Sequence, residues 1–364
     1  MQSSTTHTAR DLRDVITIGV GAYHTVIVRR DGTAWAWGRN SFGQLGDGRM
    51  GDDATSPVPV RVQRLAAVKA VTAGRTHTLA LTHDGTVWAW GANDSGELGQ
   101  GPVARVEGNI ALPVLVPGLA GVQAMAAGGG HSVVVGQGGT VWAWGENGYH
   151  QVGPGRVGGA VAVAMRVTGL PVVVAVAAGE SHSLAVARDG TVWTWGRNME
   201  EDAAAEATVT PRQITGLTDV MAVAGGRFHS LALRRDGTVW AWGSNYFGQL
   251  GDGTDESRSA PVHVPSLTAV TTIAAGWLHS VAVRRDGTAW SWGAHELLDV
   301  DGDDDYTTIP IQVPGVRGAV AIGTGDNHAV CLTQDGTVAA WGWNNFSQLG
   351  NNQSGPGGSV LLDS

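Results

Sequence analysis

Short apolar segments recur along the chain at a spacing of about 50 residues. In the second copy, residues 68–73 form one such segment, residues 77–81 a second and residues 86–90 a third. Apolar and small residues alternate in the third segment, which is typical of a β-strand with one face buried. Residues 113–116, which begin with Pro113, are expected to form a fourth strand. The pattern therefore predicts a repeating unit of four short strands.

The turns between these segments also repeat. Asp84-Gly85 stands between the second and third segments, where a tight hairpin needs residues that tolerate positive φ. A Gly-x-x-His tetrad joins the first segment to the second in every copy. Seven copies of one supersecondary unit indicate a closed array rather than separate domains. The tetrads end at His24, His77, His131, His182, His229, His279 and His328; Asp-Gly recurs at Asp31, Asp189, Asp236, Asp286 and Asp335, with Gly138-Gly139 in the third copy.

Four antiparallel strands repeated seven times predict an all-β fold, a seven-bladed β-propeller of four-stranded antiparallel blades. We expect residues 1–13 to be an N-terminal tail and residues 14–364 to form one propeller domain. The third strand of most copies reads Trp-x-Trp-Gly, and its period of two places both indoles on one face. Packing between blades explains these tryptophans better than a light-sensing or carbohydrate-stacking array, except at Trp277 and Trp343. The repeated histidines are likewise expected to be structural.

The composition narrows the class of function. The chain has 32 acidic and 23 basic residues and a net charge of −9, which argues against nucleic acid as a partner. A single cysteine, Cys331, excludes an intrachain disulfide. No apolar run reaches 18 residues, so no membrane span is expected. The polar first ten residues do not resemble a signal peptide, so we expect a cytoplasmic protein. One lysine, Lys69, among many arginines favours a GC-rich bacterial gene.

The order of the strands predicts which loops share an end of the propeller. The Gly-x-x-His turns and the long loops after Trp-x-Trp-Gly emerge at one end, here called the long-loop face. The Asp-Gly hairpins and the links between repeats emerge at the other end, the hairpin face. Most of the acidic residues belong to the long-loop face, whereas the hairpin face carries the arginine pairs 29–30, 234–235 and 284–285. The two ends therefore differ in charge.

The two residues between Gly and His break the repeat. Their neighbours scarcely vary, yet these positions differ in charge, size and polarity from copy to copy. A position that the fold leaves free and that carries arginine and aromatic residues suits recognition of a partner, although drift at exposed turns is the alternative. The candidate binding residues are Tyr23, Arg75, Glu180, Arg227, Phe228, Trp277, Leu278, Asp326 and Asn327.

The long loops show a related contrast. Five keep an Asn-x-x-Gly-x-Leu-Gly pattern or something near it, and two depart from it, at residues 198–202 and 294–306. The second of these carries Asp299, Asp301, Asp303 and Asp305, spaced as in a calcium-binding loop. A calcium loop would need glycine at its sixth position and glutamate at its twelfth, which is Pro310, so a solvated acidic loop is favoured. The five patterned loops begin at Asn40, Asn93, Asn147, Asn245 and Asn345.

Taken together, Gly-x-x-His-Thr/Ser, Asp-Gly-Thr-Val-Trp-Ala-Trp-Gly and Asn-x-x-Gly-Gln-Leu-Gly resemble the repeat of the regulator of chromosome condensation family. Residues 21–48 and 226–253 carry the resemblance most clearly, and it extends over residues 14–362. The resemblance implies a seven-bladed propeller in which both termini complete one blade, with residues 358–362 as its last strand. Functions in this family are diverse, so the resemblance says more about fold than about activity.

Three hypotheses for function follow. The leading one is a non-catalytic binding module that engages a protein partner through the long-loop face, without a cofactor. The alternative is an enzyme of specialised metabolism that cyclises or isomerises a small molecule at the mouth of the central channel. Guanine-nucleotide exchange on a small GTPase is a third possibility that the resemblance implies, although no blade has a long inserted wedge. Acid–base candidates for the enzyme are Glu180, Arg227, His150 and Asp326.

Overall fold

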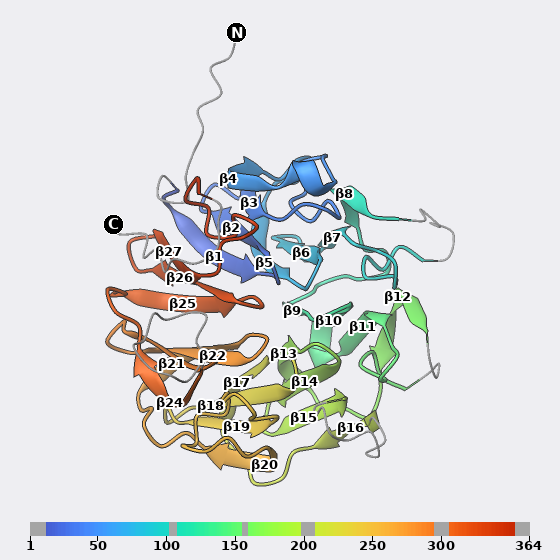
Figure 1. Cartoon of the computed structure of the whole chain (residues 1–364). Helices are drawn as coiled ribbons and strands as arrows, with labels where there is room; N and C mark the ends of the chain where they lie inside the picture. The colour runs from blue at the N-terminus through green and yellow to red at the C-terminus, as the bar shows by residue number, and fades with distance from the viewer. Residues whose placement is uncertain (1–11, 102–107, 155–158, 198–207, 295–305, 354–364) are drawn as a thin grey trace.

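Seven antiparallel β-sheets are arranged around a common axis in the computed structural model (Figure 1). The structure describes residues 12–101, 108–154, 159–197, 208–294 and 306–353. Six of the sheets have four strands, and the seventh has three among the described residues. Consecutive strands pair within each sheet, from the innermost strand outward. The predicted seven-bladed propeller is confirmed.

The first four blades follow one another along the chain. Blade 1 contains β1 (Val15–Val20), β2 (His24–Arg29), β3 (Ala34–Gly38) and β4 (Ser56–Arg61); blade 2 contains β5 (Val68–Ala73), β6 (His77–Thr82), β7 (Val87–Gly91) and β8 (Ile110–Leu115). Blade 3 contains β9 (Ala124–Ala127), β10 (His131–Val135), β11 (Val141–Glu146) and β12 (Ala160–Val167); blade 4 contains β13 (Val173–Ala178), β14 (His182–Ala187), β15 (Val192–Gly196) and β16 (Thr208–Gln213).

The remaining blades complete the circle. Blade 5 contains β17 (Val220–Gly225), β18 (His229–Arg234), β19 (Val239–Gly243) and β20 (Arg258–His263); blade 6 contains β21 (Val270–Ala275), β22 (His279–Arg284), β23 (Ala289–Ala294) and β24 (Tyr306–Gln312). Blade 7 contains β25 (Ala319–Thr324), β26 (His328–Thr333) and β27 (Val338–Gly342). Two short 3₁₀ turns lie outside the strands, η2 (Asp52–Ala54) and η3 (Gln137–Gly139).

Some boundaries differ from those expected. The fourth strand of blade 2 begins at Ile110, so Pro113 lies within it; as an outermost strand it has a free edge on which a residue without an amide hydrogen is tolerated. Leu12 lies before the expected domain start, yet it is 3% exposed and packs with Val15 and Trp37. The expected closing strand at residues 358–362 lies outside the described residues.

Adjacent blades pack the large residues of one sheet against the small residues of the next, as the alternating pattern predicts. The second indole of each repeat is buried completely or nearly so. Trp90 of blade 2, for example, lies in one cluster with Val26, Ala36 and Leu45 of blade 1 and its long loop. Each such cluster spans two blades, so the blades cannot bury their apolar faces alone. The seven buried indoles are Trp37, Trp90, Trp144, Trp195, Trp242, Trp292 and Trp341.

The glycine of each Gly-x-x-His tetrad allows the blades to meet at the axis. A Cβ at Gly74 would lie 2.5 Å from the carbonyl oxygen of Gly128 in the next blade, closer than real Cβ contacts come. The same relation holds at every junction, including the last one, where a Cβ at Gly325 would collide with the carbonyl oxygen of Gly21. These glycines let seven backbones approach one another in a closed ring.

The seven histidines are structural, as the repeat predicts. Each is buried, and its Nε2 lies within hydrogen-bond distance of a hydroxyl in the next blade. His24 meets Thr78 at 3.0 Å, and His328 meets Thr25 at 3.4 Å to close the ring. His279 instead meets Thr324, because Ala329 stands where the other blades have serine or threonine. Burial lowers the pKa of all seven, to about 3 or 4, so they are neutral near pH 7.

The patterned long loops also form hydrogen bonds with the next blade. The carbonyl of Gln44 in the first long loop accepts a hydrogen bond from the hydroxyl of Thr78 at 2.9 Å and one from the indole of Trp90 at 2.8 Å. The loop's leading asparagine holds the turn, since Asn40 Oδ1 accepts from the amide of Leu45 at 3.0 Å. In the last loop Asn344, rather than the expected Asn345, makes this contact, with Leu349. The motif therefore connects one blade to the next.

Candidate functional site

The long-loop face holds the mouth of the central channel. Each blade contributes to its wall a small residue, the tetrad glycine and the first of the two variable residues. The strand order confirms that the tetrad turns and the long loops share this end. Because the glycines carry no side chain and the residues before them are small, the variable residues supply all the charged groups and the one aromatic ring that line the mouth. Those residues are Ala22, Arg75, Gly129, Glu180, Arg227, Trp277 and Asp326.

Side chains from non-adjacent blades meet across this mouth. Arg75 of blade 2 reaches Glu180 of blade 4, with Nη1 and Oε1 2.7 Å apart. The guanidinium of Arg75 also lies 4.3 Å from the ring centre of Trp277, in blade 6. Arg227 of blade 5 lies 4.2 Å from the same ring. The indole thus has two cations within the range of cation–π attraction, and the four side chains form one connected cluster.

A second polar pair completes the mouth. The phenol of Tyr23 donates to the carboxylate of Asp326. Burial raises the pKa of Asp326 to about 6, against the opposing effects of Arg75 and of the Tyr23 hydrogen bond. Burial, followed by the charge of Asp326, raises the pKa of Tyr23. Asp326 is thus a partly desolvated carboxylate whose charge changes close to neutral pH.

Aromatic and arginine side chains extend this cluster outward over blades 7 and 1. The rings of Tyr23 and Phe346 have centroids 5.0 Å apart and are tilted by 56°. The guanidinium of Arg39 lies 4.8 Å from the centre of Phe346 and 5.8 Å from those of Tyr23 and Phe42. Both Phe42 and Phe346 come from patterned long loops. The loops therefore supply rings as well as structural contacts.

A matching group lies over blades 3 to 5. Arg227 is 4.7 Å from the ring of Phe228, and Arg197 is 5.7 Å from the same ring. Arg197 also lies 4.9 Å from Tyr149, a ring of the third long loop that is 39% exposed. This group is continuous with Trp277 through Arg227. An arginine- and aromatic-rich surface of this kind is typical of protein interfaces.

Sequence reasoning missed Arg39 and Arg197, which directly follow Trp-x-Trp-Gly. A signal for them exists, because the corresponding positions in the other blades vary just as the turn pairs do. The amide of each such residue donates to the carbonyl of the second turn residue, as from Arg39 to Tyr23 at 2.9 Å and from Arg197 to Ser181 at 2.8 Å. The two variable positions therefore lie side by side. The other members of this set are Ala92, Glu146, Ser244, Ala294 and Trp343.

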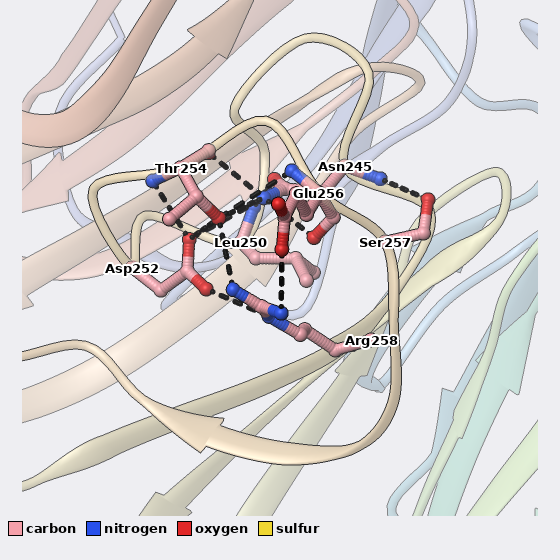
Figure 2. A network of polar contacts seen from close by, with 7 residues as sticks. All are labelled: Asn245, Leu250, Asp252, Thr254, Glu256, Ser257 and Arg258. Atoms are coloured by element: carbon pink, nitrogen blue, oxygen red, sulfur yellow. Dashed lines mark hydrogen bonds and ion pairs between the residues drawn. The ribbon is translucent and has the colours of Figure 1, made fainter.

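The fifth long loop is held in shape by a polar network, shown in Figure 2. Asn245 Oδ1 accepts from the amide of Leu250 at 2.8 Å, and its Nδ2 donates to the carbonyl of Thr254 at 2.9 Å. Arg258, from β20, donates to Asp252 at 3.2 Å and to Glu256 at 2.9 Å. This framework presents Tyr246 and Phe247, which are 43% and 37% exposed. Two acidic residues of this loop, Asp252 and Glu256, thus stabilise the loop's conformation through Arg258.

The remaining predicted residues are placed less centrally. Leu278 and Asn327 are second turn residues, and their carbonyls accept from Ala294 and Trp343. His150 lies in the third long loop with φ of 62°, where the other patterned loops have glycine or serine, and it is not among the residues that line the channel mouth. Asp299, Asp301, Asp303 and Asp305 lie outside the described residues. Among the described residues, no three His, Cys, Asp or Glu side chains gather to hold a metal ion.

The channel mouth is small. Its cavity has a volume of about 80 Å³. Pockets that bind drug-sized molecules are several times larger. Glu180, Arg227 and Asp326 do meet there, and their side chains contact Arg75, Trp277 and Tyr23 respectively. This geometry disfavours the cyclase or isomerase hypothesis. Across the described parts of the chain, no helix has the length and apolar character of a membrane span.

Comparison with known protein families agrees with the repeat. The model for the RCC1-like domain matches residues 160–357. Two models of the regulator of chromosome condensation (RCC1) repeat match further copies, one over residues 31–81 and 84–135, the other over residues 15–44, 68–97 and 122–151. Together these matches reach all seven blades.

Among curated proteins, the chain is similar to the ultraviolet-B receptor UVR8 of Arabidopsis thaliana, with 31% identity over 53% of this chain and 44% of the receptor. It is 34% identical to protein pim1 of Schizosaccharomyces pombe, over 40% of this chain and 29% of pim1. The matches thus span less than half of either relative. Both organisms are eukaryotes, and the bacterial origin expected from composition stays a prediction.

Solved structures show the same fold. Human WBSCR16 superposes with a TM-score of 0.76 at 24% identity, over 88% of each chain. Yeast RCC1 (Prp20), in a crystal structure with Kap60, superposes with a TM-score of 0.76 at 23% identity, over 100% of this chain and 88% of that one. A further structure of Prp20p, from Saccharomyces cerevisiae, gives a TM-score of 0.72 at 22% identity, over 90% of this chain and 82% of that one. At these identities the likeness concerns the fold.

Proposed function

The chain belongs to the RCC1-like domain family, and from this premise we propose that it is a non-catalytic module that binds a protein partner through its long-loop face. The observation that carries the proposal is the surface built by the variable positions. Seven turns of nearly constant framework bring Arg75, Arg227 and Trp277 into one cluster, flanked by two arginine–aromatic groups. The repeated turns hold the variable residues at fixed positions, and variable residues on a rigid framework suit recognition of a partner.

The composition of this surface supports a protein as the partner. Tyrosine, tryptophan and arginine dominate the energetics of protein interfaces because they bury a large area at a low entropic cost. Here rings from blades 1, 3, 5, 6 and 7 share one end of the molecule. A typical interface buries about 800 Å² on each side. Prp20p has binding properties to Gsp1p and histones, and Kap60 is bound to yeast RCC1 (Prp20) in a crystal structure, so proteins of this fold do bind other proteins.

The arginines of this surface already contact other side chains in the free protein. Arg75 is paired with Glu180, and both Arg75 and Arg227 are stacked on Trp277 before any partner arrives. A surface already ordered in the free protein loses little side-chain entropy on binding. Trp277 would therefore be the central anchor, with Phe228 and Tyr23 beside it. The charged neighbours would supply specificity.

The test begins with a partner captured from the source cell by the intact chain, identified, and then purified for affinity measurement. Trp277→Ala and Phe228→Ala should each weaken binding by about 30-fold or more, which corresponds to about 2 kcal/mol. Arg235→Ala, an exposed substitution on the hairpin face, is the matched control and should leave the affinity unchanged. Equal affinity of the parent and of the Trp277→Ala, Phe228→Ala double variant, with both folded, would refute this placement of the site.

A further inference from the structure

Several carboxylates of the long-loop face are paired with arginines of the same chain. Asp47, for example, lies 2.6 Å from Nε of Arg49, and both belong to the first long loop. The fifth long loop and the channel mouth hold similar pairs. Two arginines of this face differ, because Arg39 and Arg227 form no ion pair within the described part of the chain. The face therefore has two guanidinium groups without a carboxylate at ion-pair distance.

Aromatic rings hold the guanidinium of Arg39 in place. It lies 4.8 Å from the ring centre of Phe346 and 5.8 Å from those of Tyr23 and Phe42. Its Nε donates to the hydroxyl of Ser41 at 3.0 Å, and its Nη groups have no acceptor among the described residues. A guanidinium stacks on a ring through its face and donates through its edge, so these Nη groups remain available to a ligand.

Arg227 is held in the same way at the channel mouth. Its guanidinium lies 4.2 Å from the ring centre of Trp277 and 4.7 Å from that of Phe228. Its Nε is buried and has no acceptor in the parts of the chain that the structure describes. Burial raises the pKa of Asp326, and Arg75 and then Arg227 oppose that rise by their charge alone. A partly desolvated cation of this kind gains from a counter-charge that a binding partner supplies.

The two cations share one surface and have apolar neighbours. Tyr23, whose ring lies near Arg39, donates to Asp326, whose charge interacts with Arg227. Rings flank each guanidinium, so a matching ligand carries separate carboxylates beside apolar groups, as an acidic protein segment does. The whole chain has a net charge of −9, which repels a dense polyanion such as nucleic acid at long range. A few carboxylates on a protein surface meet much less of this repulsion.

Given that the long-loop face binds a protein partner, as proposed, we infer that this partner is acidic where it docks. One of its carboxylates pairs with Arg39 and another with Arg227, and an apolar side chain packs against Trp277. A carboxylate can accept two parallel N–H bonds from a guanidinium. The rings fix both guanidinium groups before binding, so these pairs form at a small entropic cost. The pairs supply specificity and speed the encounter.

The test measures the affinity of the captured and purified partner for variants of the intact chain. Arg39→Gln and Arg227→Gln remove one charge each and keep a polar side chain, and each should weaken binding about tenfold. Arg49→Gln is the matched control, because Arg49 lies on the same face and is already paired with Asp47. This control should bind the partner as the parent does. The melting temperature of each variant shows that it is folded.

Salt and a charge swap identify the counter-charge. Raising NaCl between about 50 and 300 mM should weaken the parent's binding about tenfold, and the double variant Arg39→Gln, Arg227→Gln should respond less. Arg39→Glu should bind more weakly than Arg39→Gln. Among partner variants in which single acidic residues are replaced by lysine, one should bind Arg39→Glu more tightly than it binds the parent.

The outcomes separate this inference from the proposed function. If Trp277→Ala weakens binding while both glutamine variants bind as the parent does, the face still binds the partner, and its acidic character is refuted. If Trp277→Ala, Arg39→Gln and Arg227→Gln all leave the affinity unchanged, the proposed function fails as well. Tighter binding of double-stranded DNA than of any acidic protein would overturn the choice of a protein carboxylate.

Discussion

At the scale of single residues, the division between constant and variable positions explains the site. The tetrad glycines are confined by the next blade's backbone, and the histidines are confined by the hydroxyls that they meet. The two residues between them point toward neither constraint, so their identities are free to serve binding. From the sequence alone, this freedom identified Arg75, Glu180 and Trp277 as candidates. It could not show that they touch, because their contact depends on how blades 2, 4 and 6 converge on the axis.

Asp326 provides a test at this scale. Its folded-state pKa of about 6 lies above the ordinary aspartate value of 3.8. The folded protein therefore binds this proton more tightly than the unfolded chain does. The buried charge therefore costs stability above about pH 6, and the cost vanishes below about pH 4. Asp326→Asn should raise the melting temperature at pH 7.5 and leave it nearly unchanged at pH 4. Thermal unfolding of both proteins across this range measures the effect, and a stability loss at pH 7.5 would contradict this description of Asp326.

At the scale of elements, the junctions between blades are not equivalent. Where the preceding long loop keeps its pattern, its carbonyl receives the indole N–H of the next blade, as from Trp90 to Gln44. Two loops depart from the pattern, and the indoles that follow them, Trp242 and Trp341, have no acceptor among the described residues. At the junction before blade 7, Ala329 stands where the other blades have serine or threonine, and the hydroxyl of Thr324 meets His279 in its place. Among the described residues, the indoles at the junctions of blade 4 with 5 and of blade 6 with 7 therefore lack the loop contact that Trp90 makes.

This difference can be measured by removing the indole N–H from each kind of junction. Trp90→Phe loses both apolar area and the hydrogen bond to Gln44, whereas Trp242→Phe loses area alone. Both indoles are buried to the same degree, so Trp90→Phe should lower the free energy of unfolding by about 1 kcal/mol more than Trp242→Phe does. Urea unfolding of the two variants gives the comparison. An equal loss in both would show that the loop carbonyl adds no net stability.

The elements themselves were largely predictable from the sequence. Alternation in segments such as residues 86–90, with turn dipeptides at each end, gave the three inner strands of every blade. The fourth strand was harder, because an outermost strand pairs on one side only and tolerates proline, so that Pro113 does not mark where the strand begins. That is why β8 begins at Ile110 rather than at Pro113. The choice between Asn344 and Asn345 also needed the structure, since two adjacent asparagines fit the pattern.

At the scale of the whole molecule, the ring of seven neutral histidines predicts how the protein responds to acid. Their folded pKa values of about 3 or 4 lie below the unfolded value of about 6.5. Their contribution to stability is therefore complete above pH 6.5 and is lost as the pH falls toward 4. Each histidine contributes a slope of about 1.4 kcal/mol per pH unit over this interval.

Because the histidines act together, unfolding near pH 5.5 should take up about five or more protons. This number follows from the slope of the unfolding free energy against pH, measured in urea between pH 5 and 7. Three carboxyls with raised pKa values, those of Glu97, Glu146 and Asp326, oppose the effect in part. Uptake of fewer than two protons would mean that the histidines are not held neutral in the folded ring.

The two ends of the propeller differ in what they present. The long-loop face presents a connected arginine–aromatic surface with little room for a ligand, and the hairpin face has a cavity beside the Gly138-Gly139 turn of blade 3. The repeat predicted that the ends would differ in charge. It did not predict this cavity, because its wall combines the turn at Gly138 with Leu170 and Val172, which lie about 30 residues further along the chain.

The most direct test of the central claim is hydrogen exchange of the backbone amides in the free chain and in complex with its captured partner. The account predicts slower exchange in the tetrad turns of blades 5 and 6 and in the patterned long loops, including residues 41–46 and 246–251. It predicts no change in the Asp-Gly hairpins at the opposite end. Protection confined to those hairpins, with the long-loop face unaffected, would contradict the proposal that this face binds the partner.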